Sequence, residues 1–307
     1  MKKPIETVSI IGAGAVGAAY ASILHEMDRH CVSLVAGGDR GRRLRKEGLM
    51  VNGKHYLIPV FLPEDLSKPS DLVMVAVKHH HLDEAIRDVK NRVGAETTIM
   101  SVMNGIESEE QIGAVYGMRK VLYAVTMGID ALREENRVTY TTQGKLFFGE
   151  ARSAVPAERV ARVQAFFEKA GIIYETPSDM IRILWWKFMV NVGINQTSVL
   201  LRAAYSVFQT SQEARNLMES AMREVLMLSE KAGVNLSEED IGKFGIVLQR
   251  LSPQGKTSML QDIEARRKTE VEMFAGKVIE LGKRLDVPTP INQKLFNAIR
   301  KMEAGND

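Results

Sequence analysis

The sequence lacks the features that mark secreted, metal-clustering and membrane-spanning proteins. Cys31 is its only cysteine, so the chain forms no intrachain disulfide and no cysteine metal cluster. No stretch reaches the ~18 consecutive apolar residues of a membrane span. The N-terminus has two lysines but no uninterrupted apolar core like that of a signal peptide. We therefore expect a protein of the reducing cytoplasm that neither enters nor crosses a membrane.

The sequence also lacks a large net charge, internal repeats and low-complexity segments. The formal net charge is +3 over 307 residues, which gives no reason to expect nucleic acid as a partner. The basic cluster at residues 40–46 is short and fits an anionic small molecule. Hydrophobic residues make up 45% of the chain and charged residues 26%, which is ordinary for a globular protein long enough to form two domains.

Hydrophobic patterning divides the chain into an α/β part and a helical part. Short runs rich in Val, Ile and Met alternate with amphipathic stretches, which predicts a parallel Rossmann-type sheet built from βαβ units. The expected strands are residues 8–12, 32–36, 71–77, 97–103 and 120–126. A helix at residues 156–171 and a strand at 172–176 follow, and helical periodicity then dominates. We expect a sheet domain at residues 1–177 and an all-helical domain at residues 178–307.

The loop after the first expected strand carries glycines in the G-x-G-x-x-G spacing. Such glycines permit a tight turn and let the backbone approach a pyrophosphate, while the following helix offers free N–H groups to the anion. Strand before and helix after are the context that this fingerprint requires. A glycine-rich turn without a ligand is the alternative. The expected dinucleotide-binding residues are Gly12, Ala13, Gly14, Ala15, Val16 and Gly17.

The end of the second expected strand bears on the choice of cofactor. An acidic residue there holds the ribose of NAD, whereas basic groups hold the 2′-phosphate of NADP. Here residues 36–38 are Ala-Gly-Gly, and Asp39 is followed by Arg40, Arg42 and Arg43. The arginines favour NADPH, with Arg40 as the expected contact, because a guanidinium fork binds phosphate specifically. Asp39 keeps NAD open, and a solvated basic helix start is the alternative to any contact.

Two further expected strands end in polar residues. Lys78 follows the third strand and Asn104 follows the fourth. In open parallel sheets the ligand lies outside the carboxyl ends of the strands, so both are candidates for the cofactor crevice. A surface lysine that opens a helix is the alternative for Lys78. The neighbouring residues 79–81 are all histidine, but adjacent residues on a helix diverge, so we expect no metal site.

A polar row runs through an otherwise apolar helical segment at residues 185–196. Lys187, Asn191 and Asn195 recur every four residues and therefore share one helical face. A buried polar group without a partner costs on the order of 1–3 kcal/mol, so this row is expected to face another polar surface or a bound ligand. The alternative is a lysine that extends to solvent beside asparagines that cap neighbouring helices.

A second polar row is expected late in the chain. Ser258, Gln261 and Asp262 lie near the start of an expected helix, and Glu270 follows. Together the two rows supply a cation, carboxylates, amides and a hydroxyl, a set that can hold a 2-oxo acid and protonate its carbonyl during hydride transfer. A solvated helix face is the alternative for any single residue.

These motifs resemble those of the ketopantoate reductase (2-dehydropantoate 2-reductase) family, in order and spacing and over nearly the full length. The segments that carry the resemblance are GAGAVG, Lys78, MNGIESEE, WWKFMVNVGINQ and TSMLQDIEARRKTE. The resemblance implies a Rossmann domain followed by a helical domain. It also implies reduction of 2-dehydropantoate to pantoate with NADPH, on the pathway to pantothenate and coenzyme A.

The resemblance further implies roles for individual residues. Lys187 is the expected general acid, and Asn191, Asn195 and Ser258 are expected to hold the substrate. Glu270 is expected to act in catalysis and to lie near the nicotinamide ribose. Asn104 is expected between cofactor and substrate. The implied partner is a small 2-oxo acid, and a homodimer is compatible with the sequence.

Two departures from the family pattern keep alternatives open. Gly37 stands where many members carry an arginine, so the phosphate contact passes to Arg40 or a neighbour. Tyr205 stands where an amide contacts substrate in the family, which leaves open a paralogue that reduces another branched 2-oxo acid. A catalytically silent NADPH-binding sensor is a third hypothesis, against which the retention of Lys187 and Glu270 argues.

Overall fold

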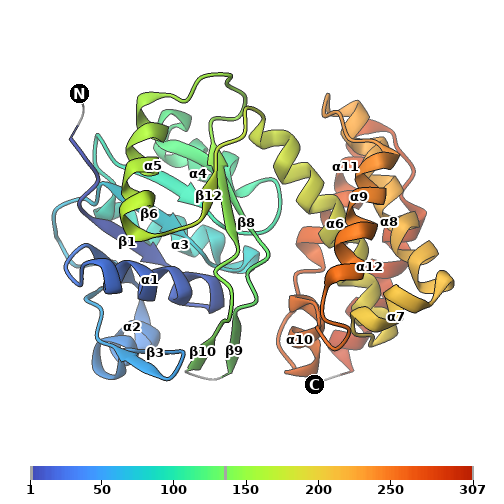
Figure 1. Ribbon diagram of the computed structural model, residues 1–307, viewed down its shortest axis with the longest axis horizontal. Coiled ribbons are helices and arrows are strands. Elements are labelled where there is room, and N and C mark those ends of the chain that lie inside the picture. The colour runs from blue at the N-terminus through green and yellow to red at the C-terminus, as the bar shows by residue number, and fades with distance from the viewer. Residues whose placement is uncertain (1–2, 135–136, 306–307) are drawn as a thin grey trace. The chain divides into compact units, whose positions relative to one another are not determined.

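The computed structural model describes residues 3–134 and 137–305 and contains two compact units. Unit 1 is Met1–Ile181 and unit 2 is Arg182–Asp307 (Figure 1). The division falls a few residues after the expected domain boundary, because helix α6 (Met180–Leu201) begins at the end of unit 1. The α/β class of the first unit and the helical class of the second are both as predicted.

Unit 1 is built around an eight-stranded sheet with the order β12-β11-β8-β7-β6-β1-β2-β5. Neighbouring strands are parallel except for the antiparallel pair β8 and β11. The strands are β1 (Val8–Ile11), β2 (Val32–Val35), β5 (Val60–Phe61), β6 (Leu72–Val75), β7 (Thr98–Ser101), β8 (Val121–Met127), β11 (Lys145–Gly149) and β12 (Tyr174–Glu175). The five expected parallel strands are therefore confirmed within one or two residues at most ends, and β5 and β11 are additions.

Helices cover both faces of this sheet, which explains why β1, β2, β6 and β7 are buried at every residue. The helices are α1 (Ala15–Met27), α2 (Gly38–Glu47), α3 (Leu82–Asp88), α4 (Ser108–Tyr116) and α5 (Glu158–Ala170), with short 3₁₀ turns at His79–His81, Lys90–Arg92 and Met118–Lys120. Alternate strand residues supply the two cores: Ile10 packs in the cluster with α1 and α5, whereas Ile11 packs in the cluster with α3 and α4.

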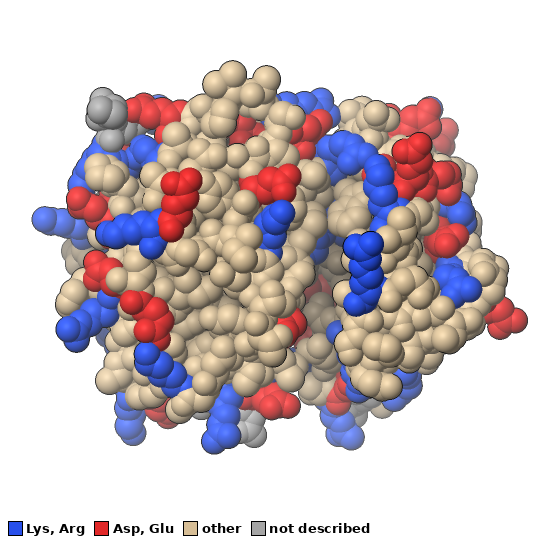
Figure 2. Space-filling view, in the orientation of Figure 1, with Lys and Arg blue, Asp and Glu red and all other residues tan. Residues whose placement is uncertain are grey.

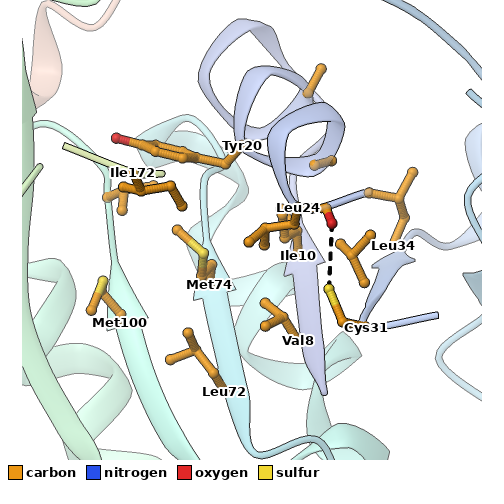
Figure 3. Packing of buried hydrophobic residues seen from close by; sticks show 14 of the residues in the cluster. Val8, Ile10, Tyr20, Leu24, Cys31, Leu34, Leu72, Met74, Met100 and Ile172 are labelled. Carbon is orange, nitrogen blue, oxygen red and sulfur yellow. Dashed lines mark hydrogen bonds between the residues drawn. The ribbon is translucent and has the colours of Figure 1, made fainter. Parts of the chain in front are cut away.

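Figure 3 shows the α1 side of this core, where Ile10 and Met74 from adjacent strands lie beneath Tyr20 and Leu24 of α1. The Tyr20 hydroxyl is satisfied by the Thr126 hydroxyl at 3.0 Å. The thiol of Cys31 donates to the Leu24 carbonyl at 3.5 Å and is 5% exposed. Helix α1 thus joins the glycine-rich loop at its N-terminus to the centre of the core.

A second, four-stranded sheet with the order β4-β3-β10-β9 was not expected from the sequence. Its strands are β3 (Leu49–Val51), β4 (Lys54–Tyr56), β9 (Leu132–Glu134) and β10 (Arg137–Thr139). Asn52 and Gly53 join β3 to β4 with φ of 49° and 75°, as a tight two-residue hairpin turn requires. β10 pairs in parallel with β3 although many residues separate them in sequence.

Unit 2 is helical throughout its regular elements. After α6 come α7 (Tyr205–Thr210), α8 (Gln212–Lys231), α9 (Glu238–Arg250), α10 (Ser258–Glu264), a π-helical turn at Glu272–Gly276, α11 (Lys277–Leu285) and α12 (Pro290–Ala304). Residues 188–199 of α6 are buried without interruption. A Cβ at Gly193 would lie 2.4 Å from the Met222 Cε, so α6 and α8 pack closely. No helix among the described residues is long and apolar enough to cross a membrane.

Candidate active site

The glycine-rich loop in unit 1 has the shape that a dinucleotide requires. Gly12 has φ of 99°, and a Cβ there would lie 2.5 Å from the Ala76 carbonyl oxygen. A Cβ at Gly17 would lie 2.1 Å from the Gly12 carbonyl oxygen, so helix α1 packs too closely on the loop for any side chain. A Cβ at Gly14 would meet no atom within 4 Å. Open space therefore adjoins the N-terminus of α1, and the loop fits a pyrophosphate there.

The expected strand-end residues lie along the same edge of the sheet as this loop. β1, β6 and β7 are adjacent and parallel, with Ile11, Val75 and Ser101 in register. Lys78 and Asn104 follow β6 and β7, and both side chains are half-buried. Gly105 has φ of 102°, which turns the chain sharply after Asn104. Unit 1 therefore brings the glycine loop, Lys78 and Asn104 to one edge.

A cavity of about 580 Å³ opens beside helix α2 and is lined by Asp39, Arg40, Arg43, Glu47 and Arg133. Burial and the nearby Arg43 guanidinium lower the pKa of Arg40 below its usual value. Arg42 instead forms an ion pair with Asp39 at 2.7 Å. Arg40 and Arg43, rather than Arg42, are thus the helix α2 arginines at this cavity. Figure 2 shows basic and acidic side chains interspersed over the drawn face of unit 1.

Sequence reasoning missed Arg133, which lies on β9 of the second sheet. Its guanidinium donates to the carbonyl of Ala13, in the glycine-rich loop, at 3.4 Å. A partial signal existed, because Asn52-Gly53 between β-type residues is a strong hairpin pattern. The position of β9 relative to that hairpin, however, depends on tertiary pairing that no local pattern reveals.

The polar row of unit 2 lies on helix α6 as expected. Asn191 is 8% exposed and Asn195 is 5% exposed, while Lys187 keeps part of its surface accessible. The intervals of four residues place the three side chains on one face, in a helix whose other buried residues are mostly apolar. The Asn195 carbonyl also accepts from the Ser198 hydroxyl at 2.9 Å.

Lys187 and Glu270 interact electrostatically. Burial lowers the pKa of Lys187 to about 8, and the Glu270 carboxylate opposes part of that shift. A desolvated ammonium with a pKa near neutrality is a suitable proton donor, because it is charged at pH 7 and gives up its proton at moderate cost. The structure thus brings together the two residues that the sequence nominated for catalysis.

The second polar row does not continue along one helix. α10 ends at Glu264, Arg266 has φ of 52°, and Glu270 lies in the irregular segment that precedes the π-helical turn. Asp262 is buried and pairs with Arg267 at 2.9 Å, which gives this carboxylate a structural role in the local turn. Glu270 therefore reaches Lys187 through the path of the loop rather than through helical spacing.

Ser258 is exposed at the first residue of α10. The adjacent Thr257 is buried: its hydroxyl caps α10 by accepting from the Leu260 N–H and lies 2.6 Å from the Ser198 hydroxyl of α6. This contact anchors the start of α10 to the helix that carries the polar row. Ser258 is held at a fixed place by its neighbour.

Thr269, the residue before Glu270, is anchored to the last helix. Glu303 of α12 accepts from both the N–H and the hydroxyl of Thr269, at 2.8 and 2.6 Å. Thr269 is 1% exposed. The π-helical turn that follows provides a local change of direction of the kind often found at functional sites.

Tyr205 begins α7 and packs against the segment that leads to α10. Its N–H donates to the Gly255 carbonyl at 3.0 Å. A Cβ at Gly255 would lie 2.9 Å from the Tyr205 ring, and burial raises the pKa of its hydroxyl. Tyr205 thus contacts the loop just before Ser258.

Two family models together match most of the chain. "Ketopantoate reductase PanE/ApbA" matches residues 8–153, and "Ketopantoate reductase PanE/ApbA C terminal" matches residues 179–303. The chain belongs to the ketopantoate reductase family. The resemblance inferred from the motifs is therefore confirmed at the level of the family.

Relatives and solved structures extend this similarity over the whole chain. The 2-dehydropantoate 2-reductase of Aquifex aeolicus is 26% identical over 305 residues, which cover 97% of each chain. The PanE/ApbA family ketopantoate reductase from Ralstonia eutropha has a TM-score of 0.83 at 23% identity and covers 98% of this chain and 99% of its own. A D-mandelate dehydrogenase with NADH and anilino(oxo)acetate has a TM-score of 0.87 at 21% identity, with the same coverage. These structures establish the shared fold.

Proposed function

We propose that this protein is an NADPH-dependent reductase that converts 2-dehydropantoate to pantoate. The observation that carries the proposal is the desolvated Lys187, which lies in a row of buried amides and interacts with Glu270. Membership of the ketopantoate reductase family and the 2-dehydropantoate 2-reductase activity named for its relatives support the choice of substrate.

The cofactor is assigned to unit 1. The glycine loop and the N-terminus of α1 are expected to bind the pyrophosphate, and Lys78 and Asn104 are expected to bind near it at the carboxyl ends of the strands. The arginine-lined cavity after β2 supports NADPH over NADH. When bound, the cofactor would supply a hydride to the carbonyl carbon of the substrate.

Lys187 is proposed as the general acid. Reduction leaves negative charge on the carbonyl oxygen, which the ammonium stabilises before it transfers one proton from Nζ to that oxygen. The oxygen becomes the hydroxyl of the product, and Lys187 is left neutral until water returns a proton. The lowered pKa, about 8, suits both steps at neutral pH, and the Glu270 carboxylate favours the charged lysine.

The amides and the hydroxyl are proposed to hold the substrate. Asn191 and Asn195 lie one and two turns from Lys187 on the same face, so they can bind polar groups of a 2-oxo acid while the ammonium addresses its carbonyl. Ser258 and Asn104 are expected to contact the substrate, and Glu270 to contact both the substrate hydroxyl and the nicotinamide ribose.

A second candidate keeps the reaction and changes the acid. Tyr205 packs against Gly255, just before Ser258, at a position where the resemblance implies an amide. This difference favours a different side chain on the 2-oxo acid, and the D-mandelate dehydrogenase of the same fold is bound to an aryl-bearing oxo acid. A paralogue that reduces another branched or an aryl 2-oxo acid is therefore the alternative.

Steady-state assays of the purified protein test both candidates. Each of 2-dehydropantoate, 3-methyl-2-oxobutanoate and phenylglyoxylate is reduced with NADPH and, separately, with NADH. We expect kcat/KM for 2-dehydropantoate with NADPH to exceed the other combinations by at least ~tenfold, or about 1.4 kcal/mol. A preference for another acid would support the alternative. Tight NADPH binding with no turnover of any acid would indicate a silent sensor and overturn the enzymatic proposal.

A further inference from the structure

Arg133 is aimed at the inner side of unit 1 by the pleat of its strand. In the antiparallel pair of β9 and β10, Arg133 lies directly opposite Val138, and Glu134 lies opposite Arg137. Opposed residues share a face, so Arg133 shares its face with Val138. Val138 is 3% exposed and packs in the α1 core cluster, whereas Arg137 is exposed. Arg133 is therefore directed inward from the edge strand of the second sheet.

The inward direction brings Arg133 to two features of the cofactor side of unit 1. Its guanidinium donates to the Ala13 carbonyl at 3.4 Å, and it lines the 580 Å³ cavity together with Arg40 and Arg43. A second, smaller cavity of about 20 Å³ shares Arg133 with the first and is also lined by Ala13 and Val138. Three arginines, two from helix α2 and one from strand β9, thus line one cavity, whose volume lies within the range of small-ligand sites.

The acidic residues at this cavity leave the arginines with excess positive charge. Asp39 is engaged by Arg42, which does not line the cavity. Glu47 is the other carboxylate, against Arg40, Arg43 and Arg133. Guanidiniums that lie near one another repel, and an anion with several oxygens relieves this by accepting hydrogen bonds from more than one of them. A phosphate monoester has that chemistry.

We propose that Arg133 is a specificity-determining residue that binds the 2′-phosphate of the adenosine ribose together with Arg40 and Arg43. The inference rests on the proposed use of a nicotinamide dinucleotide. The cavity adjoins α2, which directly follows β2, and the ribose lies at the end of the second strand in this type of fold. The pyrophosphate instead belongs to the N-terminus of α1.

This assignment also accounts for Gly37. A glycine there offers no side chain to the phosphate, and a Cβ at Gly41 would lie 2.1 Å from the Ala36 carbonyl oxygen, so α2 starts close against the strand end. In this assignment the cationic contact with the phosphate is divided between α2 and the second sheet. Selectivity for the 2′-phosphate then depends on the position of β9.

The test compares Arg133→Gln with Arg137→Gln in the full-length protein. Arg137 is the matched control, because it is one strand away, on the opposite face and exposed. Dissociation constants for NADPH and NADH are measured by fluorescence titration, and 2′-AMP and 5′-AMP are measured as competitors. We expect Arg133→Gln to weaken NADPH and 2′-AMP by at least ~tenfold, with NADH and 5′-AMP within about twofold, while Arg137→Gln changes none of them.

The other outcomes overturn the inference. Equal weakening of NADPH and NADH would place Arg133 on the pyrophosphate or in support of the loop through Ala13, and unchanged binding would make it structural. Arg133→Lys covers the case in which the glutamine variant does not fold: the lysine keeps the charge but loses the fork, so an intermediate loss confined to NADPH is expected. Binding is measured without any 2-oxo acid, so a wrong substrate assignment leaves this test unaffected. A wild-type protein without NADPH preference would instead contradict the proposed cofactor itself.

Discussion

The two candidate binding regions hold their polar groups in opposite ways. In unit 1 the glycine loop offers main-chain groups, and its shape depends on contacts too close for any side chain, as between Gly12 and Ala76. In unit 2 the row of Lys187, Asn191 and Asn195 consists of side chains on a regular helix whose backbone needs nothing unusual. A substitution in the loop therefore changes shape first, whereas a substitution in the row changes chemistry first.

The largest effect is expected from removal of the proton donor in the row. Lys187→Ala should lower kcat by roughly 10² to 10⁴-fold with little change in NADPH affinity, because proton donation and charge stabilisation act mainly in the transition state. Since only the ammonium donates, kcat of the wild type should be level below pH 7 and fall as pH rises through about 8, the pKa of Lys187. Steady-state kinetics from pH 6 to 9.5 measure both effects.

Lys187→Met is the control for folding in this experiment. The folded-state pKa of the lysine lies below its usual value, so burial of the ammonium costs stability at neutral pH, and this cost fades as pH rises from about 8 towards 10.5. At pH 7 the melting temperature of the methionine variant should therefore equal or exceed that of the wild type, while turnover is lost. Near-normal turnover in either variant would exclude Lys187 as the acid.

Two substitutions in the glycine loop distinguish its role in stability from its role in cofactor binding. Gly12→Ala should lower the free energy of unfolding by roughly 2–4 kcal/mol, because its Cβ would meet the Ala76 carbonyl at positive φ. Gly14→Ala, whose Cβ faces open space, should melt almost normally but bind NADPH about tenfold more weakly. Thermal melts and fluorescence titrations measure the two quantities. If Gly14→Ala binds NADPH normally, the pyrophosphate does not lie against this loop.

The smallest expected effect is loss of a single amide from the row. Asn191→Ala or Asn195→Ala should raise the dissociation constant of the 2-oxo acid by about three- to tenfold, and NADPH affinity should stay nearly intact. Gln196→Ala is the matched control on the same helix, because the Gln196 amide donates to Asn292 and to the Val192 carbonyl inside unit 2. This control should lose stability rather than substrate affinity. A proportional loss of NADPH affinity in the asparagine variants would mean that the row is structural.

The sequence predicted those features that local patterns encode. The parallel strands follow from short apolar runs, the glycine loop from spacings of two and three residues, and the helical row from a spacing of four, and the structure contains all of them. The second sheet was missed because its strands are three residues long and β3 pairs with the distant β10. The Asn52-Gly53 pair is a local signal for the hairpin of β3 and β4, but it does not indicate which strands pair with that hairpin.

The sequence indicated which residues are candidates for the site more readily than it indicated how they lie in space. The interaction between Lys187 and Glu270 depends on the turn at Arg266, and Arg133 reaches the cavity only through the second sheet. Neither turn nor pairing has a local sequence signature of its own. The roles of the site residues, the choice of NADPH, a homodimer and a cytoplasmic location stay predictions.

Cys31, a single buried thiol, can report how often the core of unit 1 opens. Burial raises the pKa of Cys31 to about 11, so on the order of one thiol in 10⁴ is ionised at neutral pH, and the side chain is shielded between β2 and α1. An alkylating reagent can therefore modify the chain appreciably only when the core beneath the glycine loop separates. Labelling of a single atom, with no engineered cysteine, then measures how often the cofactor-binding unit opens and how far a bound dinucleotide suppresses that opening.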